Sequence, residues 1–520
     1  MRATARIAIG FAVACVAAAA ATHAAAADRW IVATTDSPRA RTIAAASGAH
    51  PSDPAAGIWT APKPTADALA ARLRSRGLLR YTEADVRTVP TQAASHQAPA
   101  DPAQQAAAGT WWRAKILGTA GELPAGQVAA PVAVIEDGFD PTLPDIPATV
   151  TLRRPSPVAD SDHGSKVVSV IAGRGPSVYG VNPGSEVRVY GADPSCSDTA
   201  AAVRQAVRDG AKVVNMSYGF ELAGACRTHR EATSFGSNRA VMVAAAGNDR
   251  RTAWSQPGND HHVVTVGALN QAGQPTFFSN QGAHTDLTAP GEGIGVACPL
   301  FADSHDGTRD GLCTVDGTSF SAPMVAAVAA RVIAARPDLA PNQVANLLRD
   351  TATDIGPRSG WDIATGYGMV NLPGALSAPA PPVDYFEPNE DIEWLDGRHF
   401  TADKPLLRPY SRIGFNSTLD RQKDPWDVYP VWVGPRQNLA MHVRPRHATL
   451  RIAIHYPNAR TARLASSRAT AWRAARPGRS TRVVVSNNGN RGLKAWVSVH
   501  IPAGPIYATR YNLRLVRGDW

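Results

Sequence analysis

A serine at the start of a predicted helix is the first residue that could do chemistry. Gly317-Thr318-Ser319 opens an apolar run, Met324 to Ala335, that is typical of a helix. A serine in this position lies beside unpaired backbone amides and the positive end of the helix dipole, which stabilise negative charge. Pro323 is tolerated if it falls in the first turn, where its missing amide would be unpaired anyway. Ser319 is therefore a candidate nucleophile, although a plain N-cap serine has the same signature.

A candidate base and two carboxylates precede this serine in the chain. His163 begins an apolar, helix-like run, and a histidine whose pKa lies near the working pH can accept a proton. The run Val132 to Ile135 is typical of a buried strand, and Glu136 and Asp137 follow it directly. Ligands of open α/β sheets bind at the carboxyl ends of strands, so these acids are candidates for the same site. A structural histidine and a solvated strand-end turn are the alternatives.

An amide side chain follows another predicted strand. Val241 to Ala245 reads as a strand, and Asn248 comes three residues after its end. A side-chain amide can donate a hydrogen bond to an oxyanion. Asparagine at such a turn more often has a conformational role, so Asn248 alone does not identify a catalytic site.

Taken together, these segments resemble the subtilase family of serine proteases. That family carries Asp-x-Gly, His-Gly-Thr, Gly-Asn and Gly-Thr-Ser-x-x-x-Pro blocks in this order, which is also the acid, His, Ser order of subtilisin. The matching blocks begin at Glu136, His163, Gly247 and Gly317. Further matching stretches are Asn215 to Gly219, Phe278 to Asn280, Ala289 to Gly291, and Gly366 to Gly368. The resemblance covers about residues 110–373.

The resemblance implies a role for each matching residue. Ser319 attacks the scissile carbonyl, and His163 takes its proton and later returns it to the leaving amine. The side-chain amide of Asn248 and the backbone amide of Ser319 hold the tetrahedral oxyanion. Thr318 and Ser165 are interpreted as structural turn residues.

The resemblance also implies a strand that binds the substrate. Its residues are Ser217, Tyr218 and Gly219, which would pair with an extended substrate backbone and fix its register through main-chain hydrogen bonds. Asp137 lies beside the catalytic acid position and would favour a basic substrate side chain if it faces the cleft. A solvated acid is the alternative interpretation.

One position departs from the family pattern. The third catalytic residue of the family is the Asp of Asp-x-Gly, and Glu136 occupies that position here. Either Glu136 orients His163 with a side chain one methylene longer, as Glu does in other Ser-His-acid enzymes, or it fails to reach and the protein is slow or inactive. We favour the first hypothesis because Ser319, His163 and Asn248 are all retained.

The N-terminus has the pattern of a secretory signal over residues 1–27. Arg2 and Arg6 precede an apolar run from Ile7 to Ala20, and small residues follow up to Ala27. The apolar run is too short to span a bilayer. A lipid-modified Cys15 is less favoured, because no Leu, Val or Ile stands three residues before it. We expect a secreted protein, extracellular or cell-wall associated, with no membrane anchor.

The remaining chain divides into three predicted units. Residues 28–90 have a strand–helix–strand pattern that resembles a subtilase propeptide; an N-terminal domain that stays attached is the alternative. A linker over 91–109 leads to the catalytic unit, 110–376, in which strands alternate with helices. That alternation predicts an α/β fold, a parallel sheet sandwiched by helices.

A second linker, 377–383, precedes a unit over 384–520 with alternating or β-branched runs and no helical periodicity. This pattern predicts a small all-β sandwich. Its stretches Phe386 to Asp391, Asp424 to Tyr429 and Tyr511 to Leu513 resemble the bacterial pre-peptidase C-terminal domain.

Four cysteines follow the predicted signal: Cys196, Cys226, Cys298 and Cys313. An even number in an exported chain indicates disulfides. Three pairings are open, and we favour Cys196–Cys226 with Cys298–Cys313 because these pairs close the shortest loops.

Composition limits the expected partners and cofactors. The 53 basic residues exceed the 43 acidic ones but are scattered, which favours a solvated surface over a nucleic-acid partner. The implied reaction needs no cofactor. The resemblance allows a structural calcium, because the family often binds calcium in loops, but no loop here has enough spaced oxygen ligands to assign a metal site. We expect a monomer after processing that acts on proteins or peptides. A catalytically silent binding protein on the same scaffold and an esterase with the same triad are the alternatives.

Overall fold

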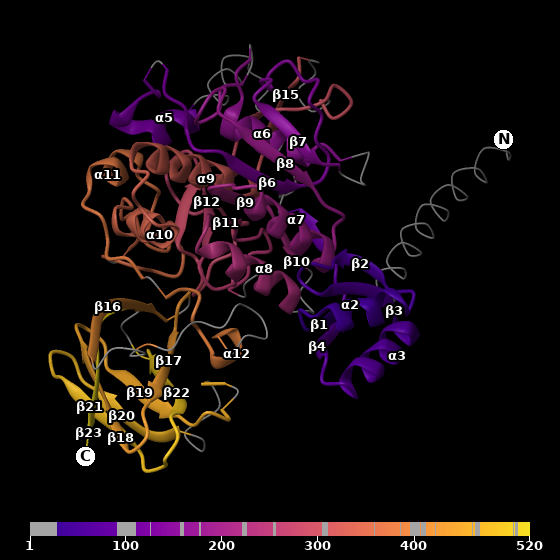
Figure 1. The fold of residues 1–520 in the computed structure, drawn as a ribbon. Helices are drawn as coiled ribbons and strands as arrows, with labels where there is room; N and C mark the ends of the chain where they lie inside the picture. The colour runs from indigo at the N-terminus through magenta and orange to yellow at the C-terminus, as the bar shows by residue number, and fades with distance from the viewer. Residues whose placement is uncertain are drawn as a thin grey trace, which may run out of the picture.

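The computed structural model describes residues 29–90, 111–124, 126–155, 161–175, 178–220, 226–252, 256–303, 310–357, 359–384, 386–395, 406, 412–421, 423–459, 461–462, 469–502, 504 and 508–519. The predicted signal peptide and the predicted linker over 91–109 lie outside these residues. The described chain builds an N-terminal, a central and a C-terminal unit, which appear in indigo, magenta to orange, and yellow in Figure 1.

The N-terminal unit is a four-stranded antiparallel sheet with two helices. Its strands, in sheet order, are β2 (His50–Asp53), β3 (Ile58–Pro62), β1 (Arg29–Thr34) and β4 (Leu79–Ala84), and its helices are α2 (Pro38–Ala45) and α3 (Lys63–Arg74). Helix α3 carries Pro64 in its first turn, where the missing amide of a proline has no intrahelical partner to lose. Val32 and Trp59 pack with α2 and α3.

The central unit is a seven-stranded, all-parallel sheet, so the predicted α/β class is confirmed. The strands, in sheet order, are β13 (Leu287–Pro290), β12 (Val263–Leu269), β11 (Val241–Ala245), β9 (Val213–Met216), β6 (Val132–Glu136), β8 (Val187–Gly191) and β7 (Val150–Arg154). Edge strands β7 and β13 were not predicted. In β7, the residues Thr151 to Arg154 are partly exposed and polar or charged apart from Leu152, so the strand lacks an apolar run.

Helices cover both faces of this sheet. Val132 and Val134 of β6 pack with α6 (His163–Ala172) and α9 (Thr318–Ala335) on one face. Ala133 and Ile135 face the other layer, with α7 (Cys196–Arg208) and α8 (Arg227–Ser237). The remaining elements are α5 (Trp111–Leu117), η1 (Gly118–Ala120), α10 (Pro341–Asp350), α11 (Leu372–Ser377) and the hairpin β14 (Ile294–Ala297) with β15 (Leu312–Val315).

Within the described ranges, α9 is the one helix long and apolar enough to cross a membrane. Its apolar window is 83% buried inside the protein. It therefore reads as the core helix of the central unit.

The C-terminal unit contains two four-stranded antiparallel sheets. One has the order β16 (Arg412–Asp420), β23 (Ala508–Asp519), β18 (Gln437–Pro445), β21 (Thr481–Asn487). The other has the order β17 (Trp426–Val433), β22 (Leu493–His500), β19 (Leu450–His455), β20 (Ala469–Ala475), and a short helix α12 (Ile392–Leu395) precedes them. Apolar residues of both sheets share one core, as predicted for a sandwich.

Candidate active site

Glu136 and His163 meet at the carboxyl end of the central strand β6. Glu136 is the last residue of β6, and His163 is the first residue of α6. The Nδ1 atom of His163 lies 2.8 Å from Oε2 of Glu136, and both side chains are at most 3% exposed. The longer glutamate side chain therefore reaches the imidazole in this fold.

Two glycines allow this close approach. Gly138 has a φ of 61°, and a Cβ at this position would collide with the carbonyl group of Ser161. Gly164 donates its N–H to the carbonyl oxygen of Asp137 over 2.9 Å, and a Cβ there would lie 2.7 Å from the same oxygen. The glycines after the acid and after the histidine thus let the β6 turn pack against the first turn of α6.

Burial and charge act in opposite directions on this pair. Burial disfavours the charged imidazolium, but the charge of Glu136 and the hydrogen bond to it outweigh burial and raise the pKa of His163 above 6.5. Burial also raises the pKa of Glu136, against the opposing effect of His163. The pair is built to stabilise a positive charge on the imidazole.

Ser319 lies in the first turn of α9, directly before Phe320. Its hydroxyl donates to the carbonyl oxygen of Ser217 over 3.1 Å, and the side chain is fully buried. The ring of Phe320, the next residue, lies 5.9 Å from the His163 ring. Because Nε2 of His163 has no hydrogen-bond partner among the described residues, the Ser319 hydroxyl must turn from Ser217 to reach it. Catalytic hydrogen bonds of this kind often form only when the substrate binds.

The position of Pro323 in its helix differs from the prediction that it falls in the first turn. Helix α9 starts at Thr318, so Pro323 lies inside it rather than in its first turn. A proline removes the hydrogen bond to the carbonyl four residues earlier, which is that of Ser319. The Ser217 hydroxyl donates to that same oxygen over 2.9 Å. Ser217 therefore compensates for the proline and forms two hydrogen bonds with Ser319.

Asn248 is oriented by Thr318, a residue that sequence reasoning treated as a plain turn residue. The Asn248 side-chain oxygen accepts from the Thr318 N–H over 3.0 Å and from the Thr318 hydroxyl over 2.9 Å. Thr318 thereby fixes which end of the amide faces α9. Asn280 positions the loop that carries Asn248, accepting from Asp249 N–H over 2.9 Å and donating to Ala246 over 3.1 Å.

The predicted substrate strand is already paired with another part of the chain. Strand β10 (Tyr218–Phe220) pairs antiparallel with β5 (Thr88–Pro90), with Gly219 opposite Val89. The Tyr218 hydroxyl contacts Nε2 of His229 over 2.8 Å, so its side chain packs inward. Asp137 accepts a hydrogen bond from the Ser161 hydroxyl over 2.8 Å.

The N-terminal unit also docks on the two helices that flank β10. Glu83 of β4 accepts from the backbone N–H groups of Arg227 and Thr228, each over 2.9 Å, at the start of α8. Asp85 accepts from the Ser197 N–H over 2.8 Å at the start of α7. Carboxylates at helix N-termini satisfy unpaired amides and complement the dipole. Ile31 and Ala33 of β1 also pack in one apolar cluster with residues of α7 and α8.

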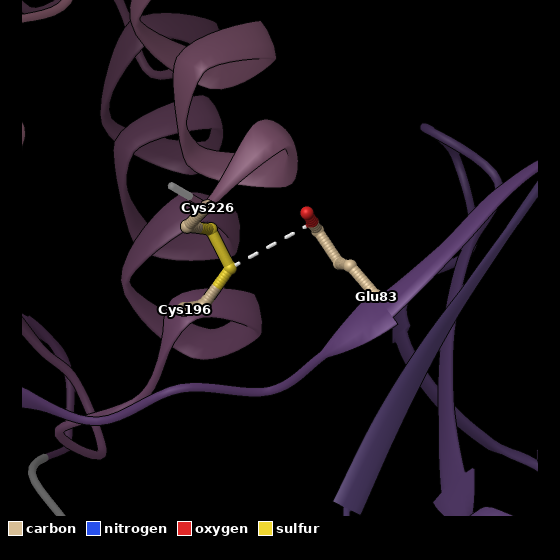
Figure 2. Close-up of side chains that lie close together, drawn as sticks. All are labelled: Glu83, Cys196 and Cys226. Carbon is tan, nitrogen blue, oxygen red and sulfur yellow. Dashed lines mark hydrogen bonds between the residues drawn. A yellow bond between two sulfur atoms is a disulfide. The ribbon is translucent and has the colours of Figure 1, made fainter. Parts of the chain in front are cut away.

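The structure joins the cysteines in the favoured pairs. The Cys196–Cys226 bond links the first residue of α7 to the N-cap of α8, and Figure 2 shows Glu83 pointing at it, 3.9 Å from Sγ of Cys196. The bond thus ties together the two helix starts that Glu83 and Asp85 cap. The Cys298–Cys313 bond joins the residue that follows β14 to a residue of β15.

The candidate site lies in the part of the chain that is similar to known proteins. The profile of the family described as "Subtilase family" matches residues 129–368. Subtilisin BL of Lederbergia lenta is 32% identical over 256 residues, which cover 47% of this chain and 89% of that protein. The cell wall-associated protease of Bacillus subtilis is 30% identical over 287 residues, 48% of this chain and 31% of that protein.

A solved structure shares the fold over most of the chain. Fervidolysin from Fervidobacterium pennivorans, described as a keratinolytic enzyme related to subtilisin, superposes with a TM-score of 0.55 and 18% identity, covering 91% of this chain and 92% of that one. In sequence, the match spans only 41% of fervidolysin's length. This chain therefore matches less than half of the length of several curated relatives.

Proposed function

Because the chain belongs to the subtilase family, we propose that it is a secreted serine endopeptidase with Ser319, His163 and Glu136 as its catalytic triad. The observation that carries this proposal is the 2.8 Å contact between Glu136 and His163. Glu136 stands where the family has Asp, and the contact supports a working acid at that position. Ser319 and Asn248 supply the other parts at the start of α9, where the ring of Phe320 lies 5.9 Å from the His163 ring.

The proposed reaction begins with proton transfer to His163. As Oγ of Ser319 attacks the scissile carbonyl carbon, Nε2 of neutral His163 takes its proton, and Glu136 stabilises the imidazolium through Nδ1. The backbone N–H of Ser319 and the Asn248 amide hold the oxyanion. The imidazolium then protonates the leaving amine as the C–N bond breaks. Water next attacks the acyl-enzyme with His163 again acting as base, and His163 returns a proton to Oγ of Ser319 as the ester bond breaks.

We further propose that residues 28–90 are a propeptide that holds the enzyme inactive. The support is that β5 pairs with β10, the strand expected to bind substrate, and that β5 runs towards Ser217. Ser217 contacts Ser319, so the chain leaves β5 in the direction of the nucleophile. Cleavage within 91–109 would release the unit.

Export, monomeric action and the relation of the C-terminal unit to the pre-peptidase C-terminal domain also belong to this proposal. The signal pattern over residues 1–27 supports export. Two antiparallel sheets over the C-terminal region support a sandwich of that kind. N-terminal sequencing of the protein recovered from the culture medium tests both export and propeptide removal.

The chemistry is tested with a fluorophosphonate probe and with self-cleavage. We expect wild type to react with the probe and to cleave itself within 91–109, and Ser319→Ala to do neither. If folded wild type does neither while Glu136→Asp does both, the silent binding protein is the correct reading. If wild type reacts but turns over only esters, the esterase alternative holds instead.

A further inference from the structure

Four carboxylates converge at the boundary between the central and C-terminal units. Asp384 and Glu387 follow α11, whereas Asp424 and Asp427 lie at the start of β17. Each offers an oxygen atom, and these four atoms all lie within 4.8 Å of one another. The Asp427 residue is fully buried and Asp424 is 8% exposed. The group, called here the carboxylate cluster, lies away from the catalytic residues in the sequence and shares none of their contacts.

Each carboxylate in the cluster has one buried oxygen without a hydrogen-bond partner among the described residues. These atoms are Oδ1 of Asp384, Oε1 of Glu387, Oδ1 of Asp424 and Oδ1 of Asp427. Donors hold the other oxygen of three of them. The Ser417 hydroxyl donates to Asp384, the Tyr511 hydroxyl to Asp427, and His262 lies 3.1 Å from Oε2 of Glu387. Three of the four side chains are thus held in place, while one oxygen of each of the four accepts no hydrogen bond from the described residues.

The positive charges nearby are engaged elsewhere. Nζ of Lys423 contacts the Gly258 carbonyl, the Thr265 hydroxyl at 2.8 Å and Asp286 at 3.4 Å, all in the central unit. His262 shares its charge between Glu387 and Glu390. In the part of the chain that the structure describes, no Lys or Arg pairs with Asp384, Asp424 or Asp427. Several buried carboxylates without a counter-charge are strongly unfavourable.

We propose that the carboxylate cluster binds one Ca²⁺ ion. Calcium takes six to eight oxygen ligands at about 2.3–2.6 Å, so ligands around one ion lie within about 5 Å of each other, as these do. An all-oxygen, strongly anionic set disfavours softer metals. Asn389 is a further candidate ligand, because its side chain is fully buried and has no partner among the described residues, and its backbone pairs with Val428, next to Asp427.

The site would also fasten the C-terminal unit to the central unit. Glu387 belongs to the cluster and also contacts His262, just before β12. His262 in turn donates its N–H to the Lys423 carbonyl, directly before Asp424. The bound ion would therefore fix the two segments that hold this boundary together. The sequence did not allow a metal site to be assigned, because these carboxylates come from segments about forty residues apart and no single loop contains all of them.

The test uses the full chain carrying Ser319→Ala, which prevents self-cleavage, after removal of metal with a chelator. Terbium replaces calcium and emits when excited through a nearby tryptophan or tyrosine; Trp426 and Tyr511 neighbour the cluster. We expect sensitised emission that Ca²⁺ competes away. The double variant Asp424→Asn, Asp427→Asn should lose this emission and bind one Ca²⁺ fewer, or bind it at least about 100-fold more weakly.

The matched control is Asp350→Asn, which removes a half-exposed carboxylate that pairs with Arg510 across the same boundary. It should bind Ca²⁺ like the parent chain. Equal calcium stoichiometry and affinity in the parent and the double variant would overturn the proposal. The carboxylate cluster would then be neutralised by bound protons and not by a metal ion. If the double variant does not fold, native mass spectrometry of the parent decides. One bound calcium whose addition raises the unfolding temperature supports the site, and no bound calcium refutes it.

Discussion

Two regions of this molecule bury carboxylates and treat them differently. At the proposed active site, Glu136 faces one base, His163, and the two share a hydrogen bond of 2.8 Å. In the carboxylate cluster, Asp424 and Asp427 face other acids, and burial with repulsion from those acids raises the pKa of both well above its ordinary value. Burial is common to both regions, so the difference lies in the neighbouring group. A base beside the carboxylate suits proton transfer, whereas other acids beside it suit the binding of a cation.

The largest expected effect concerns the active site. Ser319→Ala and His163→Ala should each lower kcat by about 10⁶-fold, the magnitude recorded for the corresponding residues of subtilisin, and by similar amounts because triad members act as a unit. Single-turnover kinetics with a peptide substrate measures both. If the losses in the two variants differ by more than about a hundredfold, Ser319 and His163 do not act as one proton-transfer unit.

Removal of the charge on Glu136 should have the next largest effect. Glu136→Gln keeps the size of the side chain but leaves the imidazolium without a counter-charge, and we expect kcat to fall about 10⁴-fold. Asp350→Asn, which changes a half-exposed carboxylate of the central unit outside the proposed catalytic group, serves as the control for charge loss alone. A loss below about tenfold would show that the 2.8 Å contact does not serve catalysis.

The oxyanion pair gives a smaller and graded effect. Asn248→Ala should lower kcat about 10²–10³-fold with little change in KM, as for the equivalent subtilisin residue. Thr318→Val keeps the backbone bond to Asn248 but removes the hydroxyl bond of 2.9 Å, and we expect about a tenfold loss. Should Asn248→Ala cost less than about tenfold, its assignment to the oxyanion would be wrong.

The pH profile should show the influence of Glu136 on His163. Neutral His163 is the proposed base, so kcat/KM should fall as the pH falls through its pKa, which Glu136 holds above 6.5. In Glu136→Gln that pKa should drop, and the acid limb should move to lower pH. An acid limb that stays in place in the variant would show that another group controls the profile.

The sequence signals of the candidate site are local. The glycines that follow Glu136 and His163 stand beside them in the chain, and the structure shows why both are needed. The central strands are continuous apolar runs and were placed within a few residues. Strand β20, Ala469–Ala475, was missed because its alanines and single arginine carry no β-branched signal beyond one threonine.

Features that depend on long-range contacts were not visible in the sequence. The hydrogen bonds of Thr318 to Asn248 join residues seventy positions apart, and Ser217 reaches the carbonyl of Ser319 across 102 positions. The carboxylate cluster draws its ligands from two separate segments for the same reason. Only the folded chain brings such groups together.

The central claim is that Glu136 is a working catalytic acid, and the comparison of wild type with Glu136→Asp tests it most directly. Both proteins are assayed for propeptide cleavage and for the rate of reaction with a fluorophosphonate probe. We predict that wild type is active and that Glu136→Asp reacts about 10²-fold more slowly, because the shorter side chain draws the carboxylate about 1 Å away from His163. A folded, inert wild type with an active Glu136→Asp variant would contradict the account.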